Sequence, residues 1–88
     1  MATAEVGIAS PWGMHARLAF HLSALCRTFP CAIHIAFRGQ RADAKEMTDI
    51  LLLAAGPDAV VTLEAEGEGE EDALEKVRQF LLVDAKAL

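Results

Sequence analysis

The sequence lacks the long apolar runs and leader segments that mark membrane-bound and secreted proteins. Its longest apolar run, Ile50 to Ala55, falls far short of the roughly 18 to 20 residues that span a bilayer. The first residues, Met1 to Glu5, place no basic region before an apolar stretch, as a secretion signal would. We therefore expect no membrane insertion and a cytoplasmic location.

Cysteine is also scarce. Cys26 and Cys31 are the only two cysteines, with no second pair to complete a zinc site. We expect plain thiols, with Cys26 packed as a small core residue. His21 and His34 have no cluster of ligands near them in the sequence, so neither a metal nor a cofactor is expected.

Basic residues are too few for a nucleic-acid-binding protein. The net charge is −5, whereas nucleic-acid binding depends on many lysine and arginine contacts to phosphate. The charges are also segregated, because the stretch from Glu64 to Glu75 holds seven carboxylates and no base. The stretch from His15 to Arg41 holds four arginines and no acid. This polarity predicts a basic face for an acidic protein partner.

Hydrophobic periodicity indicates short strands alternating with helices. A period of two predicts strands, and helical spacing of apolar residues predicts helices. Strands are predicted around Ala4–Ile8, Ile33–Phe37, Gln40–Ala44 and Val61–Glu66, and helices over Ala16–Phe29, Met47–Ala54 and Glu70–Val83.

The resulting order, βαββαβα, predicts the fold class. A chain of 88 residues supplies one apolar core and therefore one domain, residues 1–88. Strands with a single apolar face pack helices on that face and leave the other to water. We expect an α+β open-faced sandwich, with a mainly antiparallel four-stranded sheet covered on one face by three helices.

The stretch Gly13-Met14-His15-Ala16-Arg17 carries the candidate chemistry. His15 stands between a glycine turn and a helix start, beside the backbone N–H groups of Ala16, Arg17 and Leu18. These groups favour a negative charge such as phosphate, and Arg17 adds a planar donor fork. Taken by themselves, these residues favour a polar helix-start histidine and a solvated arginine over a phosphohistidine site.

The same stretch resembles the phosphorylation motif of the histidine-containing phosphocarrier (HPr) family, and the resemblance extends over the whole chain. It includes Lys45-Glu46-Met47, the run from Gly56 to Thr62, and Glu64 to Gly67 leading into an acidic helix start. The resemblance implies a phosphohistidine carrier, not a free-standing turnover enzyme. His15 would accept a phosphoryl group on Nδ1 from enzyme I and pass it to a IIA-type domain for sugar uptake, with the carrier acting as a monomer.

Three positions depart from the family pattern. Leu18 replaces a usual proline, and therefore restores a backbone donor at some loss of rigidity. Glu46 replaces a serine that a kinase phosphorylates in many relatives, and it is either a partial mimic of phosphoserine or simply a helix-start acid. Phe20 replaces a small residue and is either a docking anchor or a ring folded over Leu18 or Trp12. The expected docking set is Phe20, Ala24, Arg27, Met47 and Leu51.

Two other classes of function remain open from the sequence. An acylphosphatase-like hydrolase has a related sandwich, but it needs a second polar group paired with Arg17, and none is evident. A regulatory module of the nitrogen-related branch of the HPr family is the other alternative, because the sequence of the His15 motif also resembles that branch.

Overall fold

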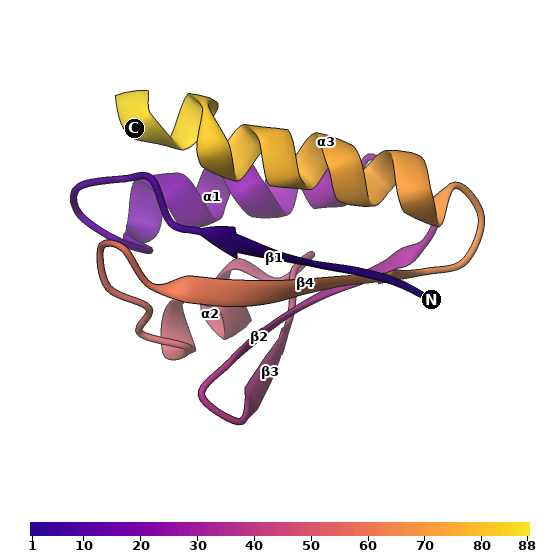
Figure 1. The fold of residues 1–88 in the computed structure, drawn as a ribbon, viewed down its shortest axis with the longest axis horizontal. Coiled ribbons are helices and arrows are strands. Elements are labelled where there is room, and N and C mark those ends of the chain that lie inside the picture. Colours follow the sequence, from indigo (N-terminus) through magenta and orange to yellow (C-terminus); the bar gives the residue numbers. More distant parts are fainter.

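The computed structural model describes all residues, 1–88, as a four-stranded sheet with helices packed against it (Figure 1). The strands are β1 (Ala2–Gly7), β2 (Ala32–Phe37), β3 (Gln40–Asp43) and β4 (Val60–Glu66). The helices are α1 (Ala16–Cys26), α2 (Met47–Leu52), α3 (Glu70–Leu82) and a final 3₁₀ turn, η1 (Asp84–Ala87). The predicted βαββαβα order is confirmed, and η1 is an addition that the periodicity did not indicate.

The sheet has the strand order β1-β4-β2-β3, and every neighbouring pair is antiparallel. Alternate residues of each strand enter the core, so that Ile33, Ile35 and Leu63 are fully buried. Helices α1 and α3 lie side by side over the sheet in Figure 1. The α+β open-faced sandwich expected from the sequence is confirmed.

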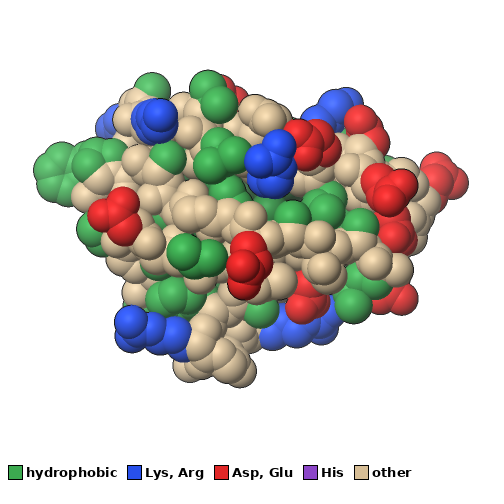
Figure 2. All heavy atoms as spheres, viewed as in Figure 1, with side chains coloured by type: hydrophobic (Ala, Val, Ile, Leu, Met, Phe, Trp, Pro, Cys, Tyr) green, Lys and Arg blue, Asp and Glu red, His purple; other side chains and the backbone are tan.

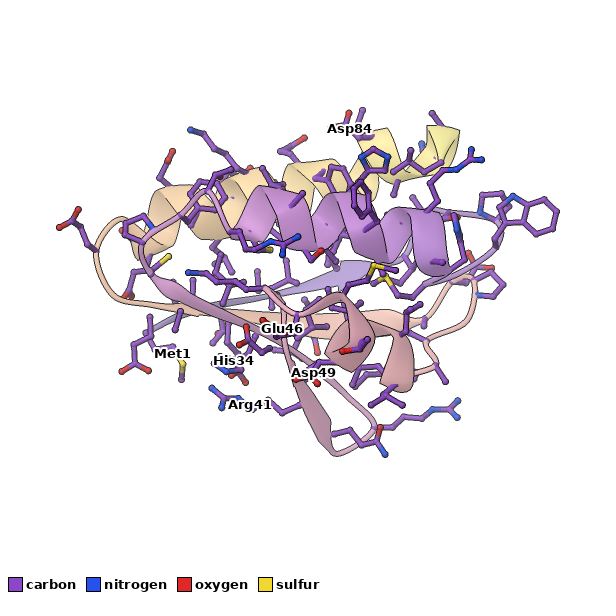
Figure 3. The ribbon with its side chains drawn as sticks, turned by 180° about the vertical axis from the view of Figure 1, so that it is seen from behind. Met1, His34, Arg41, Glu46, Asp49 and Asp84 are labelled. Atoms are coloured by element: carbon purple, nitrogen blue, oxygen red, sulfur yellow. The ribbon has the colours of Figure 1, made fainter.

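The other face of the sheet is polar. His34 is in register with Glu64 on one side and Asp43 on the other, and Arg41 donates to a Glu64 carboxylate oxygen at 2.8 Å. In Figure 3 His34 and Arg41 lie on the opposite side of the sheet from Asp84, which follows α3. None of the helices is both long and apolar enough to cross a membrane.

Helix α2 is shorter than its apolar spacing predicts. It ends at Leu52, and Ala54 adopts a left-handed backbone conformation with φ of 54°. Ala54 is exposed, so the prediction that it continues the buried face of the helix is wrong. The early end of α2 leaves Ala55 and Gly56 outside any helix or strand, and the loop before α1 contacts these two residues.

Charge is distributed unevenly over the molecule. Acidic side chains gather at the end of the molecule where the β4–α3 loop lies, as Figure 2 shows when compared with Figure 1. The C-terminus and the β1–α1 loop lie together at the opposite end (Figure 1). The chain thus separates its acidic segment from the loop that carries His15.

Candidate phosphohistidine site

The loop between β1 and α1 is fixed by its contact with the backbone after α2. The Met14 N–H donates to the Ala55 carbonyl at 2.8 Å. Gly13 has φ of 69°, and a Cβ atom on it would lie 2.6 Å from the Gly56 carbonyl carbon. Only glycine allows this approach without displacing backbone. His15, two residues further along, therefore starts from a well-defined position.

His15 is the N-cap residue of α1, with an extended backbone at φ −103° and ψ 175°. Its carbonyl accepts from the Ala19 N–H at 2.9 Å, which closes the first helical turn. The N–H groups of Ala16, Arg17 and Leu18 donate no hydrogen bond within the chain. Because the His15 side chain does not cap the helix, these donors are free to bind an anion beside the imidazole.

Leu18 contributes differently through its backbone and its side chain. Its N–H is one of the free donors, whereas its side chain is fully buried in the core. The leucine therefore anchors the first turn of α1 by packing, where a proline would restrain the backbone directly.

The imidazole of His15 is held by the far end of the chain. Its Nε2 lies 3.3 Å from a main-chain oxygen of Leu88. An oxygen of this kind only accepts hydrogen bonds, so Nε2 carries the proton in the neutral ring. The lone pair then belongs to Nδ1, which is the nitrogen able to attack a phosphorus atom. The hydrogen bond assigns the two nitrogens different roles.

Arg17 supplies an uncommitted positive charge at the site. Its side chain is exposed and takes part in none of the four salt bridges of the protein. Together with His15, Trp12 and Leu88 it lines an open hollow of about 420 Å³. A guanidinium that is not already paired is available for bidentate contact with phosphate oxygens.

Two residues of this hollow, Trp12 and Leu88, were not predicted as site residues. Trp12 is 74% exposed on the loop before Gly13, and its closeness to the His15 motif was the only available signal. Leu88 follows η1, and its main-chain oxygen lies 3.3 Å from Nε2 of His15. No local pattern predicts this long-range contact.

The predicted docking residues have different exposures. On α1, the side chains of Phe20, Ala24 and Arg27 are exposed. Met47 and Leu51 on α2 are half-buried and pack against the core, and α1 packs against α2. Phe20 is 54% exposed, and its ring meets the His21 ring edge to face, with 5.4 Å between centroids. A docking role for this set stays a prediction.

Glu46 is the N-cap residue of α2 and is exposed. Its side chain accepts no capping hydrogen bond, although its carbonyl accepts from the Ile50 N–H at 3.2 Å. The carboxylate is thus free at the start of the helix that carries Met47 and Leu51.

The remaining candidates lie outside this hollow. Cys26 and Cys31 are free and buried, and burial raises the pKa of the Cys26 thiol to about 12. Cys26 is a core residue, as predicted. His21 is exposed on α1 and His34 is half-buried on the open face of the sheet, so neither lines the hollow of His15.

Comparison with known proteins decides the family. The family model described as "PTS HPr component phosphorylation site" matches residues 2–82. The chain belongs to the HPr family. The phosphocarrier protein HPr of Cupriavidus necator is 32% identical over 71 residues, which cover 81% of this chain and 80% of the relative.

Structures of HPr proteins agree with this assignment. The crystal structure of a phosphocarrier protein HPr from Bacillus anthracis superposes with a TM-score of 0.87 and 28% identity, covering 91% of this chain and 95% of that chain. An HPr dimer from Thermoanaerobacter tengcongensis superposes with a TM-score of 0.76 and 27% identity, covering 81% and 82% of the two chains. Because that HPr is a dimer, the expectation of a monomer here stays a prediction. The chain is an HPr phosphocarrier of the phosphotransferase system.

Proposed function

We propose that His15 accepts a phosphoryl group on Nδ1 from phosphorylated enzyme I and passes it to a IIA-type domain. The observation that carries this proposal is the division of roles on the imidazole, with Nε2 held by Leu88 and Nδ1 left with the lone pair. We infer a cytoplasmic location, because the proposed partners are components of the same phosphotransferase system.

The chemical step moves one phosphoryl group between two imidazoles. The Nδ1 lone pair of His15 forms the new P–N bond as the P–N bond of the donor breaks, and the bonding pair returns to the donor nitrogen. Such a step needs positioning and charge neutralisation more than covalent participation by the protein. The guanidinium of Arg17 and the free N–H groups of Ala16, Arg17 and Leu18 provide both at the start of α1.

Open access to His15 supports a carrier. The hollow around His15 is open and is lined by only four residues. Apart from His15 itself, Arg17 has the only ionisable side chain among those four. A hydrolase would need another polar side chain to place the attacking water. The hollow thus suits a phosphoryl group that is accepted from one protein and transferred to another.

The test is incubation with phosphoenolpyruvate and a panel of enzyme I proteins, followed by intact mass and a phosphate-release assay. We expect a single added phosphoryl group that is removed by acid. Steady release of phosphate would favour the hydrolase, and no added mass with any enzyme I would contradict the carrier.

The sugar-uptake role and the regulatory role of the nitrogen-related branch share this first step. The sequence Gly13-Met14-His15-Ala16-Arg17 supports the regulatory alternative, since it also resembles the motif of the nitrogen-related branch. Transfer from the phosphorylated chain to purified IIA-type domains of each branch would separate the two roles, and so would capture of partners in each phosphorylation state.

A further inference from the structure

Trp12 has a large apolar side chain that the fold does not use. It is 74% exposed and lies outside both the buried core and the half-buried residues packed on it. Its indole N–H donates no hydrogen bond within the chain, whereas its backbone N–H donates to Ser10 Oγ at 3.3 Å. Single exposed apolar residues are common on protein surfaces, so exposure alone does not indicate a function for Trp12. Its position relative to His15 does.

That position is beside the reactive imidazole. Trp12 lines the same hollow as His15, Arg17 and Leu88. Apolar side chains project at the end of the molecule where the β1–α1 loop lies, as Figures 1 and 2 show together.

The loop holds Trp12 with little backbone freedom. The Gly13 N–H donates to the Ser10 carbonyl at 3.1 Å, and the Met14 N–H donates to Ala55 at 2.8 Å. Gly13 is in addition pressed against the Gly56 backbone. Because this loop is already ordered, little conformational entropy is lost when a partner binds the indole, and this favours affinity.

Phosphoryl transfer requires that a partner cover this hollow. Reacting atoms must approach within about 3 to 3.5 Å, so the surface around a donor imidazole has to close over His15. Trp12 and Arg17 line that hollow and must then be covered too. Tryptophan and arginine are the residues most enriched among those that dominate binding energy.

We propose that Trp12 is a docking residue of the phosphoryl-transfer complex, seated in an apolar recess on an acidic donor protein. The acidic character follows from Arg17 and Arg27, which are exposed on α1, and from the absence of any acid between His15 and Arg41. The inference rests on the proposed function, because the donor is the protein that phosphorylates His15.

The first test measures the kinetics of phosphorylation by enzyme I for the wild type, Trp12→Ala and Trp12→Phe. Trp12→Ala should raise KM about tenfold or more and leave kcat within about twofold, because the indole contributes to binding and not to the chemical step. Trp12→Phe should recover most of the loss. Val60→Ala is the matched control, since Val60 is also an exposed apolar residue, 57% exposed, at the start of β4.

The second test does not require transfer. The chain has one tryptophan, so 5-fluorotryptophan labelling gives a single ¹⁹F resonance from Trp12. In the His15→Ala background, addition of enzyme I should shift and broaden this resonance as the indole becomes buried.

The outcomes separate the two proposals. If the wild type is not phosphorylated and the ¹⁹F resonance does not move, both the carrier function and the docking role fall. If the wild type is phosphorylated but Trp12→Ala has an unchanged KM and the resonance does not move, the docking role alone is overturned. A fall in kcat with an unchanged KM would likewise overturn docking and assign Trp12 to the chemical step.

Discussion

The Nε2 atom of His15 and a main-chain oxygen of Leu88 lie 3.3 Å apart, although 73 positions separate the two residues in the sequence. The contact joins the start of α1 to the turn that follows α3. It fixes the tautomer of the ring, because the oxygen accepts and Nε2 must donate. The contact therefore leaves the Nδ1 lone pair free, which is the condition that the proposed phosphoryl acceptance on Nδ1 requires.

Replacement of His15 should remove phosphoryl acceptance and leave the fold intact. His15 is only half-buried, and its one side-chain hydrogen bond is the long contact to Leu88. We expect His15→Ala to change the free energy of unfolding by about 1 kcal/mol or less. Intact mass after treatment with enzyme I and phosphoenolpyruvate gives the result, with His21→Ala as a control that keeps full acceptance. Phosphorylation of the His15 variant would show that the site is misassigned.

Loss of the Arg17 charge should slow transfer without affecting stability. The guanidinium has no salt-bridge partner in the protein, so nothing is left unpaired when it is removed. A charge-assisted hydrogen bond contributes about 1.5 to 3 kcal/mol, which corresponds to a rate lower by about 10- to 150-fold. Rapid-quench measurement of transfer should show this for Arg17→Ala and a smaller loss for Arg17→Lys.

Arg41→Ala serves as the charge control for that experiment. Arg41 is on the opposite side of the sheet (Figure 3) and pairs with Glu64. Equal slowing by both alanine variants would mean that overall charge, and not Arg17 at the site, controls the rate.

Gly13 should tolerate no side chain, whereas Gly39 should tolerate one at a modest cost. Both have a left-handed backbone, with φ of 69° and 79°. An alanine at either position incurs about 1 to 2 kcal/mol from that conformation. Only at Gly13 does the added Cβ overlap backbone, at 2.6 Å from the Gly56 carbonyl carbon, and this overlap should cost about a further 1 to 3 kcal/mol.

Urea unfolding of Gly13→Ala and Gly39→Ala measures the difference between these two costs. The Gly13 variant should also transfer phosphate more slowly at a temperature where it remains folded, because the loop that positions His15 is displaced. Equal destabilisation by the two variants would contradict the role given to the Gly13–Gly56 contact.

Removal of the Glu46 charge should speed phosphorylation of His15 if this carboxylate repels an acidic donor. Glu46 is exposed at the start of α2, next to the predicted docking residue Met47. Glu46→Ser and Glu46→Gln should then show the same gain at low salt, since both lose the charge. The gain should shrink in a salt series, because salt screens exposed charges. Rates equal to the wild type at low salt would leave Glu46 as a helix-start acid.

Local sequence patterns predicted most of the fold. Alternating residues such as Ile33 and Ile35 place their side chains in the core, and the helical spacing from Leu18 to Cys26 matches the buried face of α1. The end of α2 was missed because Ala54 is apolar and fits helical spacing, whereas its backbone is left-handed, with φ of 54°.

The site was only partly predictable for a similar reason. His15 and Arg17 are neighbours in sequence, and a helix start brings them together by local geometry alone. Leu88 joins them because α3 packs on the sheet and on α1 and η1 continues from α3, an arrangement that no local pattern predicts. In the sequence analysis Trp12 entered only as a ring that Phe20 could cover, because an exposed aromatic residue in a loop carries no periodic signal.

The most direct test of the account is heteronuclear NMR of the ¹⁵N-labelled phosphorylated chain, which identifies the nitrogen that carries phosphorus. The chain has three histidines, His15, His21 and His34, and therefore six ring nitrogens as candidates. The account predicts phosphorus on Nδ1 of His15 and unmodified rings at the other two positions. Phosphorus on Nε2 of His15, or on either of the other histidines, would contradict it.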